Sequence, residues 1–210
     1  MSIEQTPFNS RNPSNTKRLR NFLLVPQILR LAWADARDYL TRLFIRASWK
    51  RQGLLIFPAA RLYYESRSQI KIHGRCSIGN FSVLLVGESQ NPVGFPLLEI
   101  GNHVHIGEQT NIRACGGFIK IGSNVLIANQ VTMVSANHGT KLGKLMIDQE
   151  IKRGDILIED DVWIGAGAVI LPGAIVRKGA VIAAGAVVRG EVPSNTIFGG
   201  IPAKKISERI

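Results

Sequence analysis

The stretch that decides the fold is IEDDVW-IGAGAV-ILPGAI-VRKGAV-IAAGAV-VRGEVP, residues 158–193, which divides into six hexads in register. Each hexad begins with a branched aliphatic residue, and its fifth position holds alanine or valine. The first positions are Ile158, Ile164, Ile170, Val176, Ile182 and Val188. The fifth positions are Val162, Ala168, Ala174, Ala180, Ala186 and Val192. A short, fixed period of this kind predicts a solenoid in which each repeat packs on its neighbours.

The same register continues upstream with interruptions. Hexads begin at Ile72, Ile78, Ile100, Ile106, Ile112, Ile121, Ile127 and Met133. Insertions separate them around 89–99, 118–120 and 139–157. We therefore predict a repeat domain over residues 70–206, with a loop excursion at 139–157 and a C-terminal cap at 193–210.

The hexad composition also predicts the shape of each repeat. An aliphatic side chain that points inward from a short flat strand is followed by a tight corner, where glycine relieves backbone strain. The small residue lets the next coil pack closely, and backbone hydrogen bonds then run from coil to coil at about 4.8 Å. Most of these residues are expected to serve as scaffold.

Three stretches resemble the hexapeptide-repeat acyltransferases, and within that family the sugar O-acetyltransferases of surface polysaccharide synthesis. They are SANHG at 135–139, GDILIEDDVWIGAGAVILPG at 154–173 and AGAVVRGEVPSNTIFGGIPAKKI at 184–206. The resemblance covers about two thirds of the chain. It implies an all-β, left-handed parallel β-helix of triangular section, an acetyl-CoA donor, and a homotrimer with active sites between subunits.

His138 is the candidate catalytic base. Acyl transfer to an alcohol requires a base that takes the hydroxyl proton, and histidine titrates near neutral pH. Of the four histidines, His138 ends the hexad MVSANH where the solenoid breaks into a loop, and loops commonly carry function. Its NHG context resembles the catalytic motif of the family. We expect His73, His103 and His105 to lie on coil surfaces.

The resemblance also places a coenzyme A groove. It implies that the donor is lined by Trp163, Ala166, Ala184, Arg189 and Lys204. Small residues let a pantetheine arm approach the backbone, and basic side chains suit its phosphates. In the sugar acetyltransferases the positions of Arg189 and Gly190 are commonly Thr and Lys, so the basic contact is displaced here by one residue.

Asn111 and Asn137 are the candidate contacts to the acceptor. Asn111 matches a family position that contacts the acceptor sugar, and an amide suits paired hydroxyls. A corner asparagine that tolerates left-handed backbone geometry explains Asn111 equally well at this point.

Metal and covalent catalysis are not expected. Position 143 is glycine, so His138 lacks the partner five residues away that the zinc-binding relatives of this fold use, and no third ligand joins His103 and His105. Cys76 falls at an inward small position, and Cys115 has no neighbouring base. Direct transfer in a ternary complex follows.

The positive charge lies almost entirely in the first third of the chain. The net charge is +11, and residues 1–75 hold 14 basic and 4 acidic residues. Residues 1–69 are predicted as a basic, mainly helical extension, since apolar residues recur at steps of three and four from about Arg18 to Lys50. Two readings stay open: this segment packs on the trimer, or residues 18–52 rest on anionic lipid. The hexads offer no nucleic-acid module, so no nucleic-acid partner is expected.

The expected compartment is the cytoplasm, with the inner membrane face as a site of peripheral contact. No run of about 18 apolar residues exists, and the polar N-terminus lacks the apolar core of a secretory signal. The predicted function is acetyl transfer from acetyl-CoA to a sugar hydroxyl. Alternatives are an N-acetyltransferase of an amino sugar nucleotide, a xenobiotic acyltransferase and a non-catalytic β-helix binding module.

Overall fold

The computed structural model describes residues 13–87 and 97–210. The predicted arm at 1–16 and insertion at 89–99 fall largely outside these ranges. The chain divides into two compact units, residues 1–45 and 46–210. Helix α1 (Pro13–Lys50) continues through Pro26 as one helix and supplies the first residues of the second unit. Among the described residues, no helix is long and apolar enough to span a membrane.

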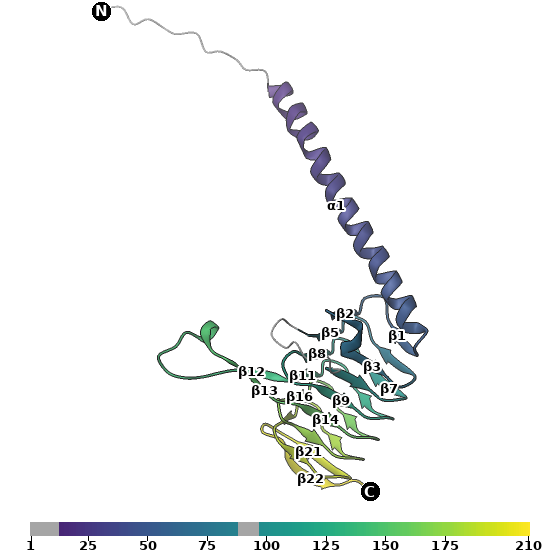
Figure 1. Ribbon diagram of the computed structural model, residues 1–210, viewed down its shortest axis with the longest axis vertical. Helices are drawn as coiled ribbons and strands as arrows, with labels where there is room; N and C mark the ends of the chain where they lie inside the picture. Colours follow the sequence, from purple (N-terminus) through teal and green to yellow (C-terminus); the bar gives the residue numbers. More distant parts are fainter. Residues whose placement is uncertain (1–12, 88–96) are drawn as a thin grey trace, which may run out of the picture. The chain divides into compact units, whose positions relative to one another are not determined.

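The second unit is a parallel β-helix whose coils build three sheets, and a fourth, two-stranded sheet projects from it, made of β12 (Ala136–His138) and β13 (Ile151–Arg153) (Figure 1). Sheet A contains β1 (Leu54–Ile56), β4 (Cys76–Ile78), β7 (Val104–Ile106), β10 (Leu126–Ile127), β15 (Trp163–Ile164), β18 (Val181–Ile182), β21 (Thr196–Gly199) and β22 (Lys204–Glu208). Sheet B contains β2 (Arg61–Tyr64), β5 (Val83–Val86), β8 (Asn111–Ala114), β11 (Thr132–Val134), β16 (Val169–Ile170) and β19 (Val187–Val188). Sheet C contains β3 (Ile70–Ile72), β6 (Leu98–Ile100), β9 (Ile119–Ile121), β14 (Ile156–Ile158), β17 (Ile175–Val176) and β20 (Glu191–Val192).

The hexad register produces the core. The first positions stack in columns, as where Ile106, Ile127, Ile164 and Ile182 follow one another across sheet A, and all four are fully buried. Burying each such side chain stabilises the fold by about 1.5–3 kcal/mol. The alanines at the fifth position are also fully buried, which confirms their role as small spacers under the next coil.

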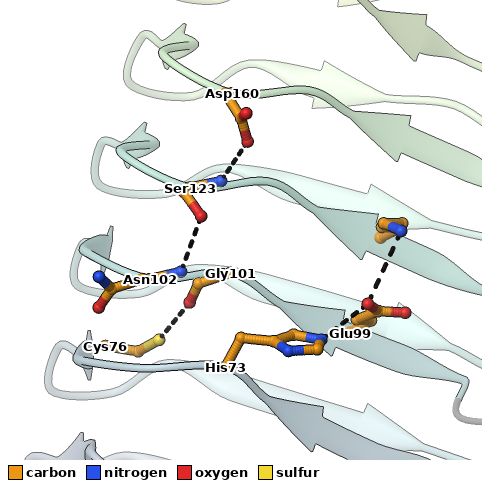
Figure 2. Close-up of polar contacts among 8 residues, drawn as sticks. His73, Cys76, Glu99, Gly101, Asn102, Ser123 and Asp160 are labelled. Atoms are coloured by element: carbon orange, nitrogen blue, oxygen red, sulfur yellow. Dashed lines mark hydrogen bonds and ion pairs between the residues drawn. The ribbon is translucent and has the colours of Figure 1, made fainter.

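At the corners, side-chain oxygens of one coil accept hydrogen bonds from backbone N–H groups of the neighbouring coil. At the corner between sheets C and A, the Asn102 Oδ1 accepts from the Arg75 N–H over 2.8 Å. One coil further, the Asn102 N–H donates to the Ser123 Oγ over 3.1 Å, and the Ser123 N–H donates to the Asp160 Oδ1 over 2.6 Å (Figure 2). These bonds satisfy corner amides that no strand pairs.

The solenoid begins earlier than residue 70. β1 pairs in parallel with β4, and β2 pairs with β5, so residues 54–64 already form coil structure. One hexad in register occurs there and was not recognised in the sequence: Ile56 pairs with Ile78 in a first-position column, and Ala60 is a buried fifth position. This first coil has no coil below it. It is covered instead by Trp49, which is fully buried, packs edge-on against Tyr64 with ring centroids 5.9 Å apart, and carries the Arg67 guanidinium 4.0 Å from its ring centroid.

The last corner is shorter than the period predicts. Val192 occupies the buried first-position column, paired with Val176, rather than the small fifth position. Arg189 and Gly190 alone connect β19 to β20, and Gly190 adopts a φ of +89° that this tight turn requires. Beyond it, β21 adds one more strand to sheet A, and β22 folds back on it antiparallel, so the C-terminal segment includes a hairpin.

Candidate active site

Four of the predicted coenzyme A residues gather at the corner between sheets A and B. Trp163 lies on β15 just before this corner, and Ala166 and Ala184 occupy it in successive coils. The Gly185 N–H donates to the Ala166 carbonyl over 2.8 Å, which places the two alanines one above the other. Lys204 pairs with Gly199 at the same end of sheet A, in the next coil. All four residues are exposed.

At the same corner, one residue of each coil has a left-handed backbone conformation, and the residue type at this position changes from glutamine to glycine. In the lower coils it holds Gln109 and Gln130, with φ of 57° and 62°. In the coils of Ala166 and Ala184 it holds Gly167 and Gly185, with φ of 70° and 68°. A Cβ at Gly185 would meet no atom within 4 Å, so the glycines leave open space rather than avoid a clash. At Gly167 and Gly185, the backbone of the corner is therefore not covered by a side chain of its own.

His138 lies at a different corner, between sheets B and C. The chain leaves the solenoid after Ser135 and returns at Gly154, and these two residues are joined by a 2.9 Å backbone hydrogen bond. Between them, β12 (Ala136–His138) pairs antiparallel with β13 (Ile151–Arg153). Asn137 and His138 are exposed, and among the described residues the His138 side chain has no hydrogen-bond partner. Its imidazole is therefore free to contact a substrate.

The excursion is held at its base by Gln149, a buried residue that the sequence prediction did not single out. Its Nε2 donates to the carbonyls of Lys141 (2.8 Å) and Lys144 (3.2 Å), and its Oε1 accepts from the Lys141 N–H (3.2 Å). Gly139, directly after His138, packs so closely that a Cβ would lie 3.0 Å from this Oε1. A glutamine between two basic, apolar segments gives no periodic signal, which is why it was missed.

Arg189 does not join the other predicted coenzyme A residues within one chain. It lies between β19 and β20, at the B–C corner, whereas Lys204 lies at the A–B corner. Arg189 thus shares a corner with the excursion that carries His138. Sheet B separates the two groups.

Asn111 faces outward from sheet B, at the end nearest the A–B corner. Its neighbours in register are Val83 and Thr132. Its Oδ1 is buried without a hydrogen-bond partner. A buried, unpaired acceptor costs about 1–3 kcal/mol, and such an atom in a native fold calls for an explanation.

The remaining histidines and cysteines take structural positions. The His73 Nε2 lies 2.8 Å from the Glu99 Oε1, and the Lys120 Nζ lies 3.7 Å from the same oxygen (Figure 2). Partial burial opposes ionisation of Glu99, but the hydrogen bond from His73 and the nearby cations outweigh it and lower its pKa. Sheet C therefore presents a paired, solvated ladder of charges.

Cys76 is inward and inert, as predicted. It is buried, its Sγ donates to the Gly101 carbonyl over 3.1 Å, and burial raises the pKa of the thiol. A hydrogen bond of 2.7 Å joins the His105 Nδ1 and the Ser77 hydroxyl. In the part of the chain that the structure describes, no three potential ligands cluster as a metal site.

Comparison with known proteins identifies the class. The family model "Bacterial transferase hexapeptide (six repeats)" matches residues 155–190. The dTDP-4-amino-4,6-dideoxy-D-glucose acyltransferase of Escherichia coli is 31% identical over 146 residues, which span 67% of this chain and 72% of the relative. The chain therefore belongs to the hexapeptide-repeat transferase family, and its predicted class, an acyltransferase, is confirmed.

Two further matches agree. The lipopolysaccharide biosynthesis O-acetyl transferase named WbbJ in Escherichia coli (strain K12) is 29% identical over 147 residues, 66% of this chain and 74% of the relative. The N-acyltransferase AntD from Bacillus cereus, in a crystal structure with dTDP and 3-hydroxybutyryl-CoA, superposes with a TM-score of 0.65 at 23% identity. That match covers 78% of this chain and 88% of the other, and it confirms the predicted left-handed β-helix fold.

Proposed function

We propose that the protein is an acetyl-CoA-dependent O-acetyltransferase that modifies a sugar hydroxyl, with His138 as general base. The imidazole takes the hydroxyl proton as the sugar oxygen attacks the thioester carbonyl. The C–S bond then breaks, the acetyl group stays on the sugar oxygen, and the proton passes to the departing thiolate. We propose direct transfer; Cys76 is a poor acyl carrier, because it is buried and burial raises the pKa of its thiol.

The observation that carries this proposal is the separation of His138 from the predicted coenzyme A residues of the A–B corner. They occupy the two corners that flank sheet B, so one chain does not bring them together. The outer face of sheet B is mostly aliphatic in its upper coils, with Val134, Val169 and Val187, and it also carries Arg61 and Arg113 in register with Val83 and Leu85. Sheet C carries a charged ladder instead. We infer that a partner copy covers sheet B, because this face lies between the two groups of predicted site residues.

Threefold symmetry then completes the site. If three copies turn sheet B toward a common axis, the A–B corner of each meets the B–C corner of the next. This arrangement joins Trp163, Ala166, Ala184 and Lys204 of one copy to Asn137, His138 and Arg189 of another. It also places basic side chains on both walls, where the donor's phosphates are expected. The homotrimer with sites between subunits is part of our proposal.

The acceptor is proposed to be a sugar of a surface polysaccharide or a lipid-linked glycan precursor. Asn111 is half-buried at the edge of the proposed cleft, and its side-chain amide is of the type that pairs with sugar hydroxyls. Asn137 is exposed beside the base. WbbJ, named for lipopolysaccharide biosynthesis, supports this acceptor class.

A second candidate is N-acyl transfer to an amino sugar nucleotide. It is favoured by the 31% identical relative named for a dTDP-amino-sugar. A base is less necessary for a neutral amine, which is already nucleophilic. The two candidates therefore differ in how strongly the rate depends on His138.

We also propose that α1 rests on anionic lipid at the cytoplasmic face of the membrane. Leu29, Trp33, Leu40 and Phe44 are exposed along one stripe, and Arg37 borders it. The test is sedimentation with anionic and neutral vesicles, comparing the full chain with a truncation of residues 1–45. The truncation stops before Arg46 because Trp49 belongs to the core of the second unit. Equal binding by both forms would overturn the membrane role.

The test of the activity is an acetyl-CoA assay with glycans and with amino sugar nucleotides, read by mass spectrometry. Acetate on a hydroxyl supports the first candidate, and acetate on the amine supports the second. If neither acceptor is acetylated and calorimetry detects no coenzyme A binding, the chain acts as a binding module and the proposal fails.

A further inference from the structure

The A–B corner has one left-handed residue in each of five successive coils: Phe81, Gln109, Gln130, Gly167 and Gly185. We call these residues the A–B column. The N–H of each later member donates to the carbonyl of the residue that precedes the member one coil below, over 2.8 to 3.0 Å. Successive members therefore follow one another at the coil spacing of about 4.8 Å and form one continuous line along the corner.

Phe81 is the unusual member of the A–B column. A bulky residue rarely adopts a φ of +61°, because its Cβ crowds the following carbonyl oxygen in the left-handed conformation. The side chain is 66% exposed, so burial of the ring does not offset this cost. A strained backbone that holds an aromatic ring in solvent indicates a function for the ring.

The two glutamines of the column present hydrogen-bonding groups beside Phe81. Both are exposed, and the Gln130 Nε2 donates to the Gln109 Oε1 over 2.8 Å. Within the part of the chain that the structure describes, this bond leaves the Gln109 Nε2 as a free donor and the Gln130 Oε1 as a free acceptor. Such a pair suits sugar hydroxyls, which both donate and accept. Asn111, the candidate acceptor contact, follows Gln109 by two residues in the same coil.

The proposed donor site gives this line of side chains a direction. The donor would run along the two glycines of the column, with its phosphates toward Lys204 in the next coil. Its thioester end then faces Gln130. β11, which leads into the excursion with His138, belongs to the same coil as Gln130. The reacting hydroxyl is thus expected at this level, and Gln109 and Phe81 lie on the side away from the donor.

We propose that Gln130, Gln109 and Phe81 bind further sugar rings of the acceptor, which is therefore an oligosaccharide or polysaccharide chain rather than a single sugar. The amides pair with hydroxyls, and the negative face of the Phe81 ring attracts the C–H groups of a sugar ring. All three side chains belong to one chain, whereas the identity and direction of the ligand rest on the proposed function. An anionic lipid surface is the rival occupant. It is disfavoured because uncharged amides and the exposed Glu108 adjoin Phe81 in the next coil.

The variant Phe81→Asn separates a binding role from a structural one. Asparagine tolerates the left-handed backbone, so the melting temperature is expected to equal or exceed that of the wild type. The affinity for oligosaccharides is expected to fall by a factor of about 2–10, because the aromatic contact is lost. Adding Gln109→Ala, which removes the free amide donor, should lower it by a further factor of about 2–10.

The probes are monosaccharides up to hexasaccharides of the same sugars, presented to the full chain on a glycan array. Calorimetry then measures the affinity for the hexasaccharide that binds best. The matched control is His103→Asn, which also replaces a ring by asparagine at an exposed left-handed residue, with φ +56°, but at the C–A corner. Its affinity for the hexasaccharide should equal that of the wild type.

Three results would overturn the proposal. The first is a wild type that binds no hexasaccharide more tightly than the corresponding monosaccharide. The second is an unchanged affinity of Phe81→Asn, including the case in which this variant loses binding to anionic vesicles instead. The third is a loss of affinity that accompanies a lower melting temperature, which would make Phe81 a structural residue.

The acetyl-CoA assay on the same sugars distinguishes these failures from failure of the proposed function. Acetylation of monosaccharides and hexasaccharides with equal efficiency would leave the transferase in place and refute only the extended site. Binding that strengthens with chain length and depends on Phe81, without acetylation of any sugar, would support the extended site and refute the transferase.

Discussion

Gly185 donates its backbone N–H to the carbonyl oxygen of Ala166 over 2.8 Å, and beside this bond its own Cα faces open space. The bond needs the backbone of both residues but no side chain at position 185. The left-handed φ of +68° already favours glycine at this position, and the missing side chain leaves open space beside the corner. In the proposed site, the pantetheine arm of the donor lies in this space.

We expect Gly185→Asn to weaken coenzyme A binding while the fold survives. Asparagine tolerates the left-handed conformation, and adopting it at φ +68° costs about 1 kcal/mol. Its side chain would enter this open space and block the donor. Calorimetry should show at least a tenfold loss in affinity for coenzyme A, equivalent to about 1.4 kcal/mol.

The matched control is Gln109→Asn, which installs the same side chain in the same column below the groove. Its coenzyme A affinity should equal that of the wild type. If Gly185→Asn binds coenzyme A normally, the groove does not run along this corner.

Replacing His138 should remove catalysis without removing substrate binding. For His138→Asn, kcat should fall by a factor of about 10²–10⁴, the range of general-base catalysis. Coenzyme A affinity and the mass of the assembled particle should not change. His103→Asn serves as the control, because His103 is exposed at the C–A corner with a left-handed φ of 56° that asparagine accepts. A His138→Asn enzyme with wild-type kcat would show that another group takes the proton.

The hexads made the solenoid predictable because every coil buries the same residue types at the same positions. Wherever an aliphatic and a small residue alternate at a period of six, the strand and corner follow. The prediction was wrong at the two ends. In the first coil the rule holds, with Ile56 first and Ala60 fifth, but a single hexad apart from the others was not recognised. At the other end, Arg189 and Gly190 form a corner that is two residues shorter than the period predicts.

The roles of the candidate site residues stay predictions, and their arrangement could not be predicted from the sequence. His138, Trp163 and Ala184, which the sequence context singled out, are exposed at or near coil corners. Which corner each occupies depends on the insertions and on the shortened last turn, and these determine that Arg189 joins His138 rather than Lys204. Gln149 acts through hydrogen bonds to backbone atoms, and such bonds cannot be predicted from a pattern of residue types.

The end cap at Trp49 should contribute strongly to stability. Removing a fully buried tryptophan costs about 3–5 kcal/mol, so Trp49→Ala should lower the free energy of unfolding in urea by that amount. Trp33→Ala makes the same change at a side chain that is 75% exposed, and it should shift stability by no more than about 0.5 kcal/mol. Equal effects of the two variants would show that Trp49 does not seal the first coil.

Acid should weaken the coil that contains Glu159. The hydrogen bond from Arg177, followed by that from the Lys178 N–H, lowers the pKa of Glu159 below its ordinary value of 4.5. Arg177 also bonds Glu191, so one guanidinium links two coils.

A carboxylate whose folded-state pKa is depressed contributes stability that is present above its unfolded pKa and is lost as the pH falls through the folded value. The free energy of unfolding of the wild type should therefore fall more steeply below pH 4.5 than that of Glu159→Gln, which does not ionise. Urea titrations between about pH 3 and 7 measure this difference. Asp148→Asn removes an exposed carboxylate of the loop that has no partner among the described residues, and its curve should stay parallel to the wild type. Parallel curves for Glu159→Gln would mean that the Arg177 bridge adds nothing to folding.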